Sequence, residues 1–181
     1  MTAPSTPSRA HRRFLRTLAP LPAADSYAPV TSLSLGAPLR RVAEQHLATA
    51  GTTRGGLLLG WQAGETLQIT HLLPSGYPPH LGTGSLELDA GYVLGAVDAA
   101  RQGSGHALDW VGHWIMAADG RPPSLGWCLR HFEQARCRAL VGTDIPLLIF
   151  GAGEEQTDLL ALIEVHGQRS PHFIPAVWGD R

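Results

Sequence analysis

The stretch that decides the fold is VGHWIMAADGRPPSLGW, residues 111–127. The apolar run 110–116 is typical of a buried strand. Pro122 and Pro123 then end any extended or helical pattern. Ser124 is a residue type that favours the N-cap of a helix, and it precedes apolar residues that fall on one helical face, namely Leu125, Cys128, Leu129 and Phe132. The stretch therefore predicts a buried strand, a tight turn and an amphipathic helix.

Outward from this stretch, helices and strands alternate in an irregular order. Helical spacing of apolar residues predicts one helix over 39–50 and a second that begins after Asp89 as N-cap. Apolar and β-branched runs predict strands at 57–62, 66–73, 139–142, 147–150, 159–165 and 172–177. These elements indicate an α+β fold in which a curved, mixed β-sheet is flanked by helices within a single domain.

Composition excludes several classes of protein. The chain has 181 residues, of which 44% are hydrophobic and 16% charged, and this is ordinary for one globular domain. It contains no apolar run of the roughly 20 residues that would span a bilayer, and no apolar segment typical of a secretory signal. We expect no membrane association and a cytoplasmic location. The two cysteines, Cys128 and Cys137, are expected to be reduced thiols.

Charge is distributed unevenly along the chain. Residues 1–20 contain four arginines and no acid, whereas the remainder contains ten arginines and all fifteen acids. The four arginines are Arg9, Arg12, Arg13 and Arg16. Because proline, serine and threonine surround them, residues 1–28 are predicted to be a flexible basic arm with a possible short helix, and residues 29–181 to be the folded domain. Binding of nucleic acid by the arm is an alternative function, but four charges are few and the rest of the chain is acidic.

The chain resembles the JAB/MPN (Mov34) metalloprotease family, whose zinc site is the JAMM motif. Four features in order carry this resemblance: Gly55-Gly56 followed by Leu57–Leu59 and Gly60, then Gly112-x-Trp114, then Pro122-Pro123-Ser124, then Gly142-Thr143-Asp144. The resemblance covers about residues 30–165. It implies an MPN/JAB-like fold, in which a strand and a helix precede the glycine-rich strand and a second helix precedes the motif strand.

In that family, two histidines and an aspartate hold zinc, and a glutamate serves as the general base. The resemblance places Ile115 and Ala117 at the histidine positions, Trp127 at the aspartate position and Thr53 at the glutamate position. Only Ser124, which stabilises the oxyanion in the family, is retained. Aliphatic side chains have no lone pair, and indole only donates hydrogen bonds. We therefore expect no bound zinc, no other cofactor and no catalysis of the family's kind.

Two residue groups offer alternative sites. His113 shares a strand face with positions 115 and 117, so it is a candidate for the vacated pocket together with Ser124 and Trp127. Cys128, His131 and Cys137 lie near one another in sequence, but they lack the spacing of a structural zinc site.

The sequence therefore predicts a non-catalytic MPN/JAB-like domain that acts as a scaffold or binds a protein partner, either another protein or a second copy of itself. The resemblance also suggests an E1-like or ubiquitin-like protein as a neighbour in the same system. The alternative is a divergent zinc-dependent peptidase or other hydrolase.

Overall fold

The computed structural model describes residues 7–15, 28–48, 54–77, 85–121, 123–153, 157–168 and 170–179. Within them lie twelve helices and strands. In chain order they are α1 (Arg9–Phe14), β1 (Ser32–Leu35), α2 (Ala37–Ala48), β2 (Arg54–Ala63), β3 (Thr66–Pro74), α3 (Ala90–Gly103), β4 (Asp109–Met116), α4 (Leu125–Cys137), β5 (Leu147–Ala152), β6 (Thr157–Ile163), β7 (His172–Ile174) and β8 (Ala176–Trp178).

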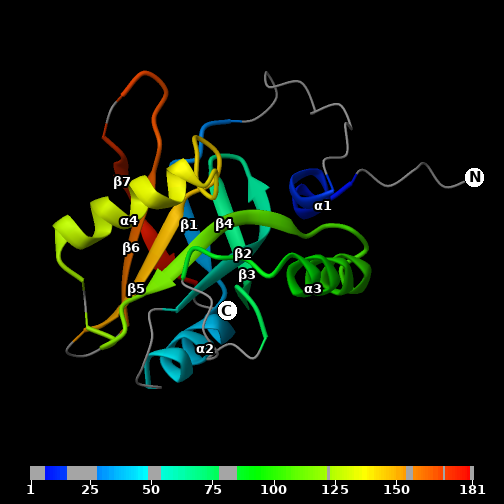
Figure 1. The fold of residues 1–181 in the computed structure, drawn as a ribbon, viewed down its shortest axis with the longest axis horizontal. Coiled ribbons are helices and arrows are strands. Elements are labelled where there is room, and N and C mark those ends of the chain that lie inside the picture. Colours follow the sequence, from blue (N-terminus) through cyan, green and yellow to red (C-terminus); the bar gives the residue numbers. More distant parts are fainter. Residues whose placement is uncertain are drawn as a thin grey trace, which may run out of the picture.

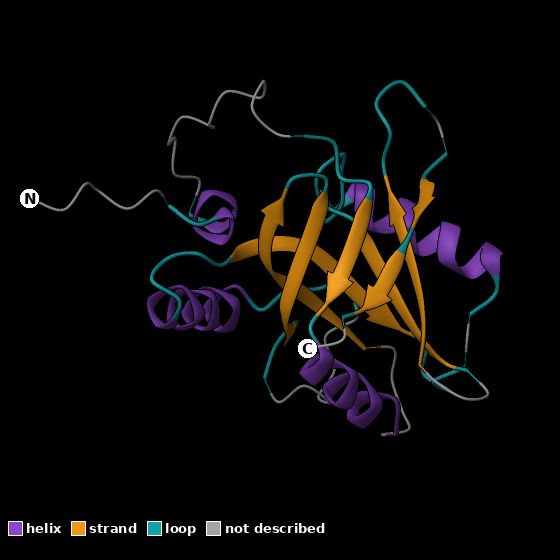
Figure 2. Ribbon diagram, turned by 180° about the vertical axis from the view of Figure 1, so that it is seen from behind, coloured by secondary structure: helices purple, strands orange, loops and turns teal. Residues whose placement is uncertain are grey.

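The eight strands form one mixed sheet in the order β7-β6-β5-β4-β2-β3-β1-β8. Its two outer strands, β7 and β8, are consecutive in the chain and are separated only by Pro175. β7 pairs antiparallel with β6, and β8 pairs parallel with β1. The indole of Trp178 also donates to the carbonyl of Thr157 on β6, at 3.4 Å. Residues 172–178 therefore bridge the two edges of the sheet, which curls until it is nearly closed (Figure 2).

Helices cover both faces of this curved sheet (Figure 1). α2 packs its buried residues Leu39 and Ala43 into one core cluster. The second core cluster lies on the opposite face, where it joins residues of α1, α3 and α4 to the sheet. β4 serves both clusters because its side chains alternate: Trp114 and Met116 face the α2 side, and Ile115 faces the other.

The glycines of the Gly-Gly-Leu-Leu-Leu-Gly segment are required by close backbone contacts. A Cβ on Gly56 would come within 1.9 Å of the Leu73 carbonyl oxygen, and one on Gly60 within 1.9 Å of that of Gln68. β2 also has register shifts on both sides of Leu59, against β4 and against β3. A packing requirement within the sheet thus explains the pattern.

The α+β class, the single domain and the curved mixed sheet agree with the sequence expectation, as do most elements. The strand predicted at 139–142 is wrong. Ala139 has a φ of 52°, and the amide of Leu140 donates to the carbonyl of Ala135, so this segment ends α4 instead of extending. The strand predicted at 172–177 is interrupted at Pro175, where the chain crosses from one sheet edge to the other.

The short helix expected within residues 1–28 is confirmed, but the described part of this segment is not a free arm. Residues 9–14 form α1, which packs against α3 and β4, and Ala10 is fully buried in the core. The boundary expected at residue 29 therefore does not separate residues 7–15 from the domain. Among the described helices, none is long and apolar enough to cross a membrane.

Candidate functional site

The candidate site lies where β4 ends and α4 begins, the corner to which the sequence assigns the family's metal ligands. Ile115, on β4, is completely buried among apolar residues that include Cys128 and Phe132 of α4. Ala117 follows the last residue of β4 and is half-buried. Position 115 therefore belongs to the hydrophobic core that joins β4 to α4.

Ser124 is exposed and serves as the N-cap of α4, as predicted. Its backbone is extended (φ −61°, ψ 152°), and its hydroxyl accepts a hydrogen bond from the amide of Trp127 at 3.4 Å. This contact satisfies one of the amides that a helix leaves free in its first turn. The capping role accounts for the serine without any catalytic function.

Trp127 and His131 form a stacked pair on α4. Their ring centroids are 3.6 Å apart at an interplanar angle of 23°. The Nδ1 of His131 donates to the Trp127 carbonyl oxygen at 2.9 Å, which fixes the imidazole. Trp127 is half-buried and packs against the core cluster that holds Ile115. An indole thus occupies volume at the start of α4 where the resemblance would place a carboxylate.

His113 is fully buried on β4, on the same sheet face as Ile115. Its Nε2 lies 2.9 Å from the carbonyl oxygen of Ser85. A carbonyl only accepts, so Nε2 carries the hydrogen and Nδ1 is a bare acceptor. Nδ1 is buried and has no hydrogen-bond partner among the described residues.

The pKa of His113 is lowered to about 4, chiefly by burial. The hydrogen bond to the Ser85 carbonyl acts in the opposite sense, and the nearby charge of Arg13 lowers the pKa further. His113 is therefore neutral at pH 7. It points toward the segment at Ser85 and α1 and makes no contact with Ser124 or Trp127 in the hydrogen-bond network.

The remaining sequence candidates are dispersed. Cys128 is buried, with its pKa raised by burial, and Cys137 is exposed. Both are free thiols, as expected. In the part of the chain that the structure describes, no three histidine, cysteine or acidic residues gather in a way that would hold a metal ion. Thr53, the position of the general base, and Arg16 lie outside the described residues.

Three arginines of the predicted nucleic-acid arm are held by the protein itself. Arg9 pairs with Asp144 at 2.7 Å. Arg12 donates to the Pro7 carbonyl at 3.0 Å. Arg13 donates to the carbonyls of Ala139 and Arg138 at 2.5 and 2.6 Å, and its guanidinium lies 5.4 Å from the Trp110 ring centroid. Arg9 and Arg13 thus anchor α1 to the rest of the domain, a role that the composition of residues 1–28 did not indicate.

A cavity of about 950 Å³ lies away from the corner of β4 and α4. Its walls combine charged residues of α1 with apolar residues of the sheet, including Arg9, Arg12, Trp61, Val111 and Ile163. Of the described site candidates, neither Ile115, Ala117, Ser124 and Trp127 nor His113 lines it. This cavity and the described part of the expected site are therefore separate.

Comparison with known proteins identifies relatives in structure only. No family model matches the chain, and no curated protein matches its sequence. The fold is similar to the solution structure of a protein from Desulfitobacterium hafniense, with a TM-score of 0.55 and 15% identity, over 82% of this chain and 94% of that one. It is also similar to a protein from Salinibacter ruber, with a TM-score of 0.51 and 19% identity, over 81% of this chain and 92% of that one. Both similarities concern the fold alone. They extend over nearly the whole length of the two other proteins, and they assign no activity to this chain.

Proposed function

We propose that the protein is a non-catalytic MPN/JAB-like domain that acts as a protein-binding or scaffold subunit. The observation that carries this proposal is the burial of Ile115 in the core at the position of a metal ligand. Burying an imidazole-bound cation there would require removing packed apolar side chains from their contacts. The serine of the motif survives, and it has a structural task as the cap of α4.

The order of elements supports the MPN/JAB part of the proposal. β1 and α2 precede the glycine-rich β2, α3 precedes β4, and Ser124 opens α4, in the order that the family leads one to expect. The site can be tested by rebuilding it with Ile115→His, Ala117→His and Trp127→Asp in one chain. If the corner descends from a zinc site, this chain should bind one zinc and gain thermal stability with it.

A control chain carries Ile115→Asn, Ala117→Asn and Trp127→Asn. It measures how much stability is lost when polar side chains are placed in the core without the zinc ligands. A zinc-dependent rise in melting temperature for the first chain alone supports the proposal, even when both chains are destabilised. Equal behaviour of the two chains with and without zinc contradicts the MPN/JAB assignment.

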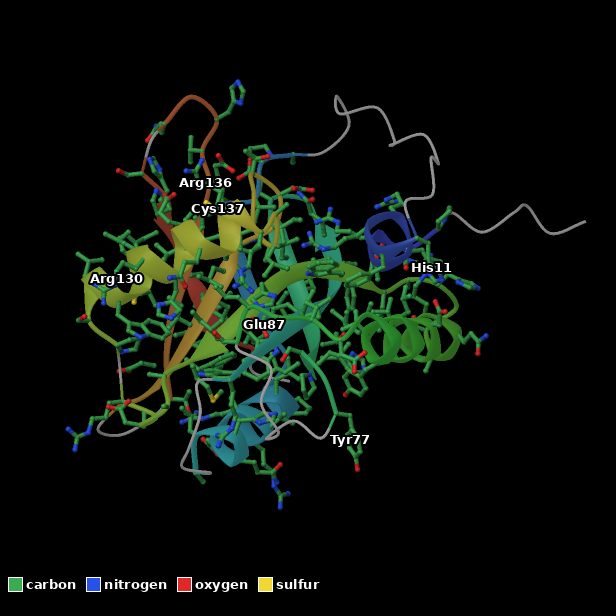
Figure 3. All side chains as sticks on the ribbon, viewed as in Figure 1. His11, Tyr77, Glu87, Arg130, Arg136 and Cys137 are labelled. Atoms are coloured by element: carbon green, nitrogen blue, oxygen red, sulfur yellow. The ribbon has the colours of Figure 1, made fainter. Side chains whose placement is uncertain are left out.

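The binding part of the proposal predicts a dimer or a complex with another protein in solution. The exposed apolar side chains include Tyr77 beside α3, Phe173 on β7 and Val177 on β8, and Tyr77 projects from the body of the protein (Figure 3). Light scattering on the purified chain should give more than a monomer mass, alone or with a partner identified by pull-down. A strict monomer whose partner binding is unaffected by Tyr77→Ser, Phe173→Ser and Val177→Ser would argue against these surfaces.

A further inference from the structure

The N-terminal helix α1 is bound to the domain as a separate ligand would be. It has six residues, whereas isolated helices shorter than about 12–15 residues are marginal in water. Its helical form therefore depends on the surface beneath it. In Figure 1 it lies beside α3, at one end of the sheet.

The contacts of α1 are mainly polar, and they reach three separate elements. The backbone amide of Arg9 donates to both carboxylate oxygens of Asp109, at 3.0 and 3.2 Å. The Arg9 guanidinium pairs with Asp144, and the His11 ring lies 3.4 Å from a carboxylate oxygen of Asp98 on α3. Figure 3 shows His11 on the part of α1 beside α3.

Two further contacts complete the docking surface. Arg13 supplies donors to the carbonyls of Arg138 and Ala139, just after the end of α4, and covers the Trp110 ring. Ala10 is the one α1 residue with no exposed surface. The helix thus presents the buried Ala10, the half-buried Phe14 and two arginines to a surface with three carboxylates. We call this surface, formed by Asp98, Asp109, Trp110, Asp144 and the carbonyls at 138–139, the α1 site.

Such an interface has a low barrier to exchange. One buried methyl group and one half-buried phenyl ring contribute much less hydrophobic stabilisation than the packed core of the sheet, and partly exposed ion pairs are weakened by salt. The Arg9 Nη1 atom is also buried without a hydrogen-bond partner among the described residues. Twelve residues, 16–27, connect α1 to the rest of the domain, and an extended chain of that length reaches about 40 Å.

We propose that the α1 site exchanges its own helix for α1 of a second copy of this chain, so that two copies hold each other by reciprocal N-terminal helices. Every contact described above forms equally well between two chains, because the helix and its site are the same in both. This inference rests on the proposed scaffold function and specifies a second copy of the chain as the partner. Its test is independent, because a chain that does not exchange helices can still bind another protein.

The experiment reverses the charge of one member of the Arg9–Asp144 ion pair in each of two chains. One chain carries Arg9→Asp, and a second, enlarged by a tag, carries Asp144→Arg. In each variant alone, the residues at positions 9 and 144 carry charges of the same sign. This holds whether the helix docks on its own chain or on an identical copy. Only an exchanged dimer of the two different chains restores both ion pairs. The chains are mixed at high concentration in mild urea, returned to buffer and analysed by native mass spectrometry.

We expect at least about five-fold more mixed dimer from this pair than from tagged and untagged wild-type chains, with the excess lost in high salt. Arg9→Asp combined with Asp144→Arg in one chain should restore the wild-type behaviour. Adding Ala10→Asp to both partners should abolish the mixed dimer. Both reversed residues are partly exposed, and circular dichroism checks that the chains fold. Folded chains that give no more mixed dimer than wild type would overturn the proposal.

Discussion

The corner of β4 and α4 and the α1 site border the same core cluster, but they are held by different forces. At the corner, Ile115 packs among aliphatic and aromatic side chains. At the α1 site, Ala10 is fully buried in the same cluster and the half-buried Phe14 packs against it, while arginines and carboxylates supply polar contacts around them. Equal burial of these two residues therefore does not mean equal importance for stability. Packing in the sheet is expected to unfold with the whole domain, whereas the docked helix can open locally.

The largest effect that separates the two regions is expected from Ile115→Asp. An unpaired carboxylate in this apolar cluster should cost at least about 4 kcal/mol of unfolding free energy. Urea denaturation followed by tryptophan fluorescence would measure it. Ile115→Val, which removes one methylene group, is the matched control and should cost about 1 kcal/mol. A folded Ile115→Asp chain with near wild-type stability would show that the corner is open to water.

The next largest effect on stability is expected from His113 as the pH is lowered. This residue lies on β4, near both regions. Its folded pKa of about 4 is below the unfolded value of about 6.5, so the unfolded chain takes up the proton first as pH falls. The stabilisation is complete above pH 6.5 and is lost toward pH 4, by about 3 kcal/mol in total. His113→Gln keeps a donor for the Ser85 carbonyl but does not titrate. The wild-type chain should lose more stability than this variant between those pH values, and parallel curves would contradict the prediction.

Removal of the α4 cap should have a smaller effect at the corner. Ser124→Ala leaves the Trp127 amide without its side-chain acceptor and should cost about 1 kcal/mol. Ser124→Asp is the control, because aspartate also caps helices and should preserve stability. Both values can be read from thermal or urea unfolding. A loss several times larger for alanine would imply a further role for the serine.

The smallest effect on global stability is expected from Ala10→Asp at the α1 site, about 1 kcal/mol or less, although Ala10 is as buried as Ile115. Hydrogen–deuterium exchange should show α1 amides losing protection while β4 remains protected. Undocking also removes Arg13 from His113, so the pKa of His113 should rise. NMR titration of the histidine would detect the change. Global unfolding of the Ala10→Asp chain would show that α1 is an integral part of the domain.

Sequence patterns predicted the strand–turn–helix at the centre of the chain because each element there has a local cause. The N-caps Asp89 and Ser124 both accept the expected amide hydrogen bonds, and β4 follows the apolar run. The burial of Ile115 also follows from its residue type and its place on this strand.

Long-range contacts limited the rest of the sequence prediction. Residues 7–15 form a short and mostly polar segment, and their docking surface comes from residues distant in sequence, among them Asp98, Asp109 and Asp144. The strand expected at 139–142 failed because an apolar triplet, Ala139–Val141, follows the end of α4 in a left-handed turn. Nothing in the local pattern distinguishes that turn from a strand. The cavity also escaped prediction, since its walls come from both ends of the chain.

The bridge formed by residues 172–178 has a consequence for biosynthesis. These residues leave the ribosome after the other strands that the structure describes, yet they pair with β1, the first of those strands. A nascent chain therefore carries unpaired edges on β1 and β6 until residues 172–178 have been made. During that interval both edges can pair with other chains, so the growing polypeptide is exposed to aggregation until the bridge forms.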